Sequence, residues 1–248
     1  MNTSYTLQQR DVISHTFLRI ERAIPNAPIV TIIETPQIHV VDKPSGIPVH
    51  PNVHYNYNTV GMIIGLKHCV NRIDKPTSGI VVFAKTSGMC RKLKQMLDNG
   101  AVKKRYIAKV FGDFSEGLAD VQFDSDGWLD CRSDIVVGAK ITTAQTRFRH
   151  IKCIKCSEEI YSILEAVPKT GRTHQIRKHL KSLGFPIVND LAYGRKLPAE
   201  LRGSEDVDII DEDMEPVMYL HSYQYTFDDA IYTASVPSWA ECTAKELG

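Results

Sequence analysis

Short runs of alternating apolar and polar residues recur along this 248-residue chain, and Gly, Pro, Asp or Asn bounds most of them. Val, Ile, Tyr, Phe and Thr dominate the runs, which is typical of β-strands. The strands that we expect lie at 29–33, 39–42, 80–84, 106–111, 143–151, 161–167, 218–225 and 231–235. Many strands with few, irregularly placed helices favour an α+β fold. The pattern predicts a central, mostly antiparallel mixed sheet flanked by helices and loops, rather than repeated βαβ units.

Apolar residues at helical spacing predict two helices. In the first, Ser87 is a candidate N-cap and Gly100 marks the end. The second follows Gly171 and stops at Gly184. A weaker helical pattern covers 59–67. The apolar face of the first helix comprises Met89, Leu93, Met96 and Leu97, and that of the second comprises Ile176, Leu180 and Leu183.

Composition fits a globular protein, with 43% hydrophobic and 24% charged residues. No apolar run approaches the roughly 20 residues of a membrane helix, so we expect no membrane partner. Residues 1–10 resemble neither a signal peptide nor a transit peptide. The six cysteines are scattered, which favours a reducing compartment. We therefore expect a cytoplasmic location, with the nucleus and the mitochondrion as open alternatives. Separately, we expect a monomer.

The net charge is only +1, but the charges are segregated. Residues 89–109 carry seven basic residues against one acid, Asp98, and 169–181 carry five basic residues and no acid. An acidic run at 205–215 restores most of the balance. This distribution is consistent with a basic working face, and equally with ordinary solvated surfaces.

Two similar turns could present an aspartate. Residues 41–46 and 73–79 both contain an apolar residue followed by Asp-Lys-Pro. In the second turn Arg72 and Lys75 flank Asp74, and their positive potential favours the carboxylate that a nucleophile requires. The alternative for each turn is an Asp that only hydrogen-bonds its own backbone.

Two basic clusters could hold an anionic ligand. Arg172, Thr173 and His174 lie near the expected start of the second helix, where backbone amides and basic side chains form an anion site. Arg177 occupies another part of that helix and could pair bidentately with a buried carboxylate. An ordinary basic helix is the alternative. The other cluster is Lys103, Lys104, Arg105 and Tyr106. Its bases could bind phosphate while the ring of Tyr106 stacks on a nucleobase. The alternative is a tyrosine that lies in the core.

Signatures of several other enzyme classes are missing. The chain has no G-x-S-x-G, Walker or G-x-G-x-x-G motif. Cys153 and Cys156 have the spacing of a zinc-binding pair, but no second pair follows. We expect no metal and no cofactor.

Taken together and in this order, the motifs resemble the RluA family of pseudouridine synthases, over roughly residues 29–240. The stretch 71–79 with Ala84-Lys85-Thr86 is similar to the family's catalytic motif, and 104–108 is similar to the motif that supplies the active-site tyrosine. Residues 170–194 and Leu220-His221-Ser222 resemble its later motifs. The resemblance implies the pseudouridine synthase fold. It also implies isomerisation of uridine in RNA without a cofactor, with Asp74 as nucleophile, Tyr106 stacking on the flipped base and Arg177 orienting Asp74.

A narrower resemblance concerns the substrate and the domains. Residues 43–59, and Asn71 in place of the family's usual His, look like the eukaryotic branch that modifies position 32 of tRNA. Residues 11–21 resemble the end of a small RNA-binding module. We therefore expect an N-terminal extension at 1–28, a catalytic domain at 29–248, and tRNA as the substrate. The alternatives are an rRNA synthase, an RNA-binding protein of the same fold with little turnover, and a metal-dependent RNA enzyme built on Cys153 and Cys156.

Overall fold

The computed structural model describes residues 4–16, 18, 20–116, 123–137, 140–156, 159–194, 217–240 and 246. Strands dominate the described part, and they belong to one mixed sheet. The strands are β1 Val30–Glu34, β2 Ile38–Lys43, β3 His68–Cys69, β4 Ser78–Ala84, β5 Lys103–Phe111, β6 Trp128–Val137, β7 Lys140–Cys156, β8 Glu159–Pro168, β9 Leu220–Phe227 and β10 Ala230–Thr233. The helices are α1 Val60–Ile63, α2 Ser87–Asp98 and α3 Gln175–Ser182, followed by a 3₁₀ turn, Ser238–Ala240.

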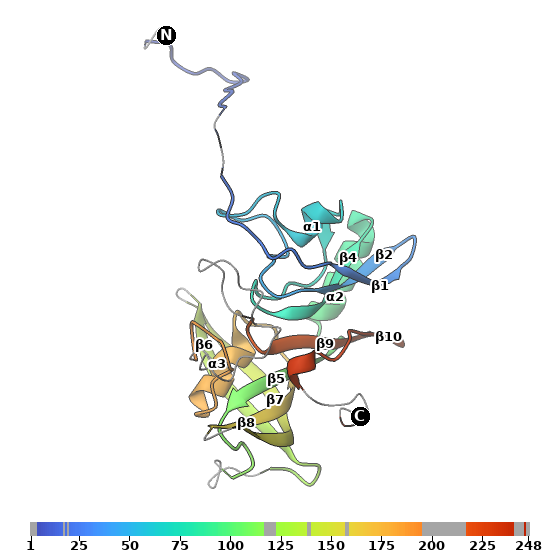
Figure 1. Cartoon of the computed structure of the whole chain (residues 1–248). Coiled ribbons are helices and arrows are strands. Elements are labelled where there is room, and N and C mark those ends of the chain that lie inside the picture. The colour runs from blue at the N-terminus through green and yellow to red at the C-terminus, as the bar shows by residue number, and fades with distance from the viewer. Residues whose placement is uncertain are drawn as a thin grey trace.

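The strand order of the sheet is β1-β2-β4-β9-β5-β8-β7-β6, with β10 beside β9 and β3 beside β4. Among the described strands, β4 and β9 pair in parallel and the other pairs are antiparallel. The expected α+β fold with a mostly antiparallel mixed sheet is thereby confirmed. Figure 1 shows β1, β2 and β4 with α1 and α2 in the upper part, and β5 to β8 with α3 in the lower part. Strand β9 crosses between them, so the β4–β9–β5 junction joins the two halves.

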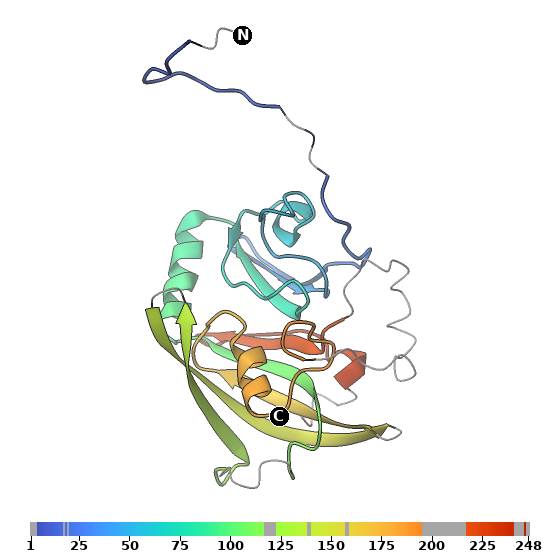
Figure 2. The ribbon, with the colours of Figure 1, turned by 90° about the vertical axis from the view of Figure 1, so that its left-hand side faces the viewer.

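Alternation along the strands divides the core between two faces of the sheet. On one face, Val82 and Phe148 belong to a large cluster that also contains Leu93 of α2 and Leu180 of α3. We call this the helix face; Figure 2 shows both helices in the side view. On the opposite face, Val81 packs in a cluster with Val60 of α1. Burial of both faces explains why the central strands read as nearly continuous apolar runs.

The helix boundaries differ from those expected. Thr86, not Ser87, is the N-cap of α2, because its Oγ1 accepts a hydrogen bond from the Met89 amide at 3.2 Å. Helix α3 begins only at Gln175, after His174 with a left-handed φ of 55°. The pattern at 59–67 yields just the short α1. Two strands, β3 and β6, were not expected; β6 includes Asp130, Arg132 and Ser133, residues that rarely signal a strand.

The first described residues lie apart from the sheet. Residues 4–16 are exposed and extend away from the body in Figure 1. Glu21 contacts the body, because its carboxylate accepts hydrogen bonds from the amides of Asn56, Tyr57 and Asn58. The division between an extension at 1–28 and a catalytic domain at 29–248 stays a prediction. Among the described helices, none has the length and apolar character needed to cross a bilayer.

Candidate active site

Asp74 lies in a turn that β4 holds in place. The buried side chain of Asn71 donates to the Ile80 carbonyl at 3.1 Å and accepts from the Val82 amide at 2.7 Å. The Thr77 amide closes the turn on the Asp74 carbonyl at 3.1 Å. Asn71 thus fixes the start of the turn to the strand that follows it. The Asp74 side chain retains 29% exposure, so one side of the carboxylate faces solvent.

Lys43 ties together the two Asp-Lys-Pro turns noted in the sequence. Its Nζ donates to the carbonyls of Pro44, Ile47 and Lys75 at 2.8–3.0 Å, and the side chain is fully buried. Burial lowers the pKa of Lys43 to about 7. The sequence analysis missed this lysine, although its place in the repeated motif was a usable signal.

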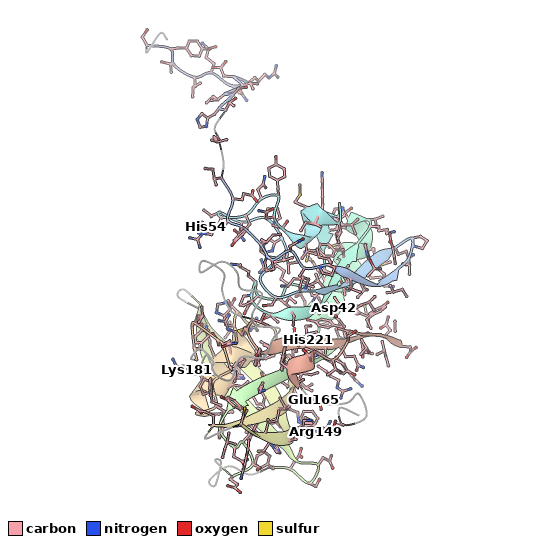
Figure 3. All side chains as sticks on the ribbon, in the orientation of Figure 1. Asp42, His54, Arg149, Glu165, Lys181 and His221 are labelled. Carbon is pink, nitrogen blue, oxygen red and sulfur yellow. The ribbon has the colours of Figure 1, made fainter. Side chains whose placement is uncertain are left out.

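Asp42, labelled in Figure 3, lies on β2, and burial raises its pKa to about 6.

The β4–β9–β5 junction sets the distance between the Asp74 turn and Tyr106. Ser222 of β9 pairs with Gly79 on one side and with Tyr106 on the other. Gly79 has φ of +105°, and a Cβ there would collide with the Ser222 backbone, so the close approach of the two strands requires glycine. Neighbouring strands lie about 4.8 Å apart. The start of β4 directly follows the turn that carries Asp74. Tyr106 therefore lies two strands away from this turn.

Tyr106 is buried, and its hydroxyl lies 2.8 Å from that of Tyr225. Burial, with the neighbouring Tyr225, raises the pKa of Tyr106 well above its ordinary value. The phenol is therefore neutral at physiological pH. It can donate or accept a hydrogen bond, but it does not add a negative charge beside Asp74.

Arg177 joins two carboxylates. Its Nε and Nη2 form a bidentate pair with Asp190, both at 2.7 Å, and its Nη1 donates to Asp74 Oδ2 at 2.8 Å. Asp190 is fully buried and also accepts from the amides of Ala192 and Tyr193. Burial alone would raise the pKa of Asp190, but the contacts with Arg177 hold this pKa below its ordinary value. The buried bidentate partner expected for Arg177 is thus Asp190, which the sequence analysis did not single out.

His174 lies near Oδ1 of Asp74, the carboxylate oxygen that Arg177 does not bind. Its Nε2 lies 3.6 Å from Asp74 Oδ1, and its Nδ1 lies 3.0 Å from the Tyr193 hydroxyl. Burial is the main cause that lowers the pKa of His174, and the charges of Arg177 and Lys178 lower it further. The charge of Asp74 acts in the opposite direction. A neutral imidazole is therefore the main form at neutral pH. The left-handed backbone of His174, just before α3, aims this ring at Asp74.

The expected anion site before α3 differs in detail from the sequence interpretation. The Arg172 amide is already bound by Gln175 Oε1 at 3.1 Å, so it is not free for a ligand. Gln175 also donates to Gln145 and Thr146 of β7, which fixes the loop to the sheet. The side chains of Arg172 and Thr173 are exposed next to His174.

The remaining basic residues divide between two faces of the sheet. Arg72 is exposed, and its Nη1 lies 3.2 Å from His50 Nε2. The Lys75 ammonium lies 5.3 Å from the centre of the Tyr55 ring. Lys104 lies on the same face as Tyr106, and its Nζ is 3.5 Å from the Thr170 carbonyl.

Arg105 lies on the opposite face from Tyr106, because successive side chains of a strand alternate. There it pairs with Glu165, which also binds Arg149 at 2.6 Å. Figure 3 labels Glu165 and Arg149 in the lower part of the sheet. Lys103 is exposed on the Arg105 side of the strand. The structure thus separates Lys103 and Arg105 from the Asp74 group, contrary to the sequence interpretation that grouped all three bases with Tyr106.

The arrangement supplies a solvent-facing carboxylate, an arginine that holds it, and a neutral phenol on β5, with β9 between them. The charge-assisted hydrogen bond from Arg177 fixes the orientation of the Asp74 carboxylate. These are the elements that nucleophilic catalysis by an aspartate requires.

The family model described as RNA pseudouridylate synthase matches residues 37–182, more than half of the chain. The chain therefore belongs to this family, and the resemblance to the RluA group is confirmed. Among curated proteins, it is 32% identical to mouse "Pseudouridylate synthase RPUSD2" over 81% of this chain and 36% of that protein. It is 37% identical to "tRNA pseudouridine(32) synthase, mitochondrial" of Saccharomyces cerevisiae, over 77% of this chain and 42% of that protein.

The fold agrees with a solved structure. "Human RNA Pseudouridylate Synthase Domain Containing 1" superposes with a TM-score of 0.63 and 18% identity, over 86% of this chain and 85% of that chain. The chain spans about half or less of the length of the first curated relatives that it matches.

Proposed function

We propose that this protein isomerises uridine to pseudouridine in RNA. The observation that carries the proposal is Asp74: it keeps one side open to solvent while Arg177 and His174 hold the other. Family membership, over the segment that contains Asp74, Tyr106 and Arg177, supports the same reaction.

The reaction needs no co-reactant. The bond between ribose C1′ and N1 of uracil breaks, the base rotates, and C1′ bonds to C5. The proton leaves C5 and N1 gains one, so atoms and electrons balance. Asp74 acts at the ribose, either by direct attack at C1′ or by promoting a glycal intermediate. Tyr106 stacks on the base, and its neutral phenol takes part in proton transfer.

The target uridine must leave its stack to reach Asp74. Unstacking costs a few kcal/mol, least in a loop. Exposed Arg72 and Arg172 contact the phosphates on either side of the flipped nucleotide, and Lys75, Lys104, Thr173 and His174 line the approach. Lys103 and Arg105 were expected to contact RNA as well, and their face of the strand makes them the weakest members of that set.

We propose tRNA as the substrate, with position 32 of the anticodon loop as the target. The yeast relative whose name gives this position supports the choice, as does the sequence likeness at 43–59. The monomeric state and the cytoplasmic location also stay predictions.

A panel of RNA transcripts tests the substrate. Purified protein is incubated with anticodon stem-loops that carry U or C at position 32, and with an rRNA fragment, and pseudouridine is mapped by chemical labelling and primer extension. A signal that requires U32 supports the proposal. Modification of the rRNA fragment alone would contradict the tRNA assignment and leave the isomerase assignment standing.

A further inference from the structure

At the far end of β5 from Tyr106, three potential metal ligands from two separate segments meet. They are Asp113, in the connection after β5, and His150 and Cys153 of β7. One ligand atom from each lies within 4.8 Å of the others. Cys153 Sγ and His150 Nε2 are 3.4 Å apart.

A β-bulge makes this arrangement possible. Residues three apart on a regular strand point to opposite faces. The pairing of β7 with β8 passes from His150–Leu164 to Lys152–Ile163, so Ile151 is an extra residue. The extra residue reverses the alternation and places His150 and Cys153 on one face. Cys156, three residues further along a regular part of the strand, does not share the cluster.

Ser162 brings Asp113 to these two residues. Ser162 pairs with Cys153 across β7 and β8 and is fully buried. Its Oγ donates to the Gly112 carbonyl and accepts from the Phe114 amide, both at 2.9 Å. These two bonds clamp the backbone on either side of Asp113. The Gly112 amide adds a third bond, to the Ile160 carbonyl at 2.7 Å.

We propose that Asp113, His150 and Cys153 form a binding site for a divalent transition metal, with zinc as the natural occupant. One thiolate, one imidazole and one carboxylate are a donor set that suits Zn²⁺, and water completes a tetrahedron. The three side chains are partly exposed, so an ion can enter. Asp113 Oδ1 is bound by Ser115 at 2.6 Å, which fixes the direction of the carboxylate. The carboxylate also accepts a hydrogen bond from the Cys153 thiol, and the ion takes the place of that thiol proton.

This site is separate from the proposed catalysis. Phe111, the last residue of β5, follows Tyr106 by five residues, or about 17 Å at about 3.3 Å per residue, and Asp113 lies beyond it. The metal ties the β5–β6 connection to the bulge of β7 and acts on stability. It differs from the sequence expectation of no metal, which looked only for a second ligand pair after Cys153 and Cys156.

Cobalt titration of the reduced full-length protein tests the site. Co²⁺ bound through a thiolate gives a near-ultraviolet charge-transfer band, and titrated Zn²⁺ should displace it. We expect one equivalent of Co²⁺ to produce this band in the wild type and in Cys156→Ser, the matched control. Cys153→Ser should lose the band, and His150→Gln or Asp113→Asn should weaken Co²⁺ binding at least about tenfold.

Thermal unfolding supplies a second measurement. Zn²⁺ should raise the unfolding temperature of the wild type and of Cys156→Ser, but not that of Cys153→Ser. A band that is absent in the wild type, or that is lost equally in Cys156→Ser, would overturn the proposal. Pseudouridine formation should be the same with and without a chelator, because the site lies far from Asp74.

Discussion

Arg177 reaches Asp74 with a single nitrogen, Nη1, at 2.8 Å, because Asp190 occupies the other two. The order of burial explains this division: Asp190 is fully buried, whereas Asp74 keeps 29% exposure. Asp190 thus anchors the guanidinium, and the anchored guanidinium positions the carboxylate that faces solvent. Asp74 is held firmly on one side and stays accessible on the other.

Replacing Arg177 with Ala should reduce both stability and turnover. The change leaves Asp190 buried without its partner, and breaking a buried pair in this way costs roughly 3–5 kcal/mol. Urea unfolding measures the loss, and Lys178→Ala, the next residue of α3, is the control. Wild-type stability together with a wild-type rate in Arg177→Ala would show that this contact positions nothing.

Replacing Lys43 with Met should destabilise the protein at neutral pH. The carbonyls of Pro44 and Ile47 lose their donor, whereas that of Lys75 keeps the Gly46 amide at 2.9 Å. Each buried unsatisfied group costs about 1–3 kcal/mol. The Lys43 pKa is about 7 in the folded state against 10.5 ordinarily. Between these values the unfolded chain binds the extra proton, so this group makes the wild type more stable as pH rises. The difference in unfolding free energy between wild type and Lys43→Met should therefore grow from pH 7 to pH 10. A constant difference would show that Lys43 is exposed to solvent and keeps its ordinary pKa.

Replacing Arg172 with Gln should weaken binding to all RNAs alike. An exposed arginine that contacts phosphate releases counterions, so its loss should flatten the slope of log affinity against log salt by about 0.7 for single strands. Filter binding at several salt concentrations gives the slope. Lys155→Gln, at the distal end of β7, should leave the slope unchanged. Tyr106→Ala should also leave the slope unchanged while abolishing turnover, because stacking carries no charge. An unchanged slope in Arg172→Gln would show that the RNA does not contact Arg172.

Local patterns predict much of this fold. The eight expected strands all exist, because buried strands here are rich in Val, Ile and Tyr and end at turn residues. The polar strand β6 escaped notice, since pairing with β7 rather than its own composition makes it a strand. The contact of Asp74 with Arg177 followed from family motifs, whereas Asp190 and Lys43 did not. Their roles depend on which carboxylate and which carbonyls the fold buries nearby, and spacing along the chain does not reveal that.

The sequence pattern also grouped residues that the structure separates. Lys103, Lys104 and Arg105 form one basic run, but alternation along β5 sends Arg105 to Glu165 on the face opposite Tyr106. Conversely, the bulge at Ile151 joins His150 to Cys153, which a regular strand would separate. Both outcomes depend on strand geometry that the charge pattern does not contain.

Asp74 carries the proposed chemistry, and Asp42 in the similar turn is its matched control. Single-turnover formation of pseudouridine in a uridine-containing anticodon stem-loop is measured for the wild type, Asp74→Asn and Asp42→Asn. We predict no detectable product with Asp74→Asn, at nearly unchanged RNA affinity, and continued turnover with Asp42→Asn. Substantial turnover by folded Asp74→Asn, or complete inactivity of folded Asp42→Asn, would contradict this prediction.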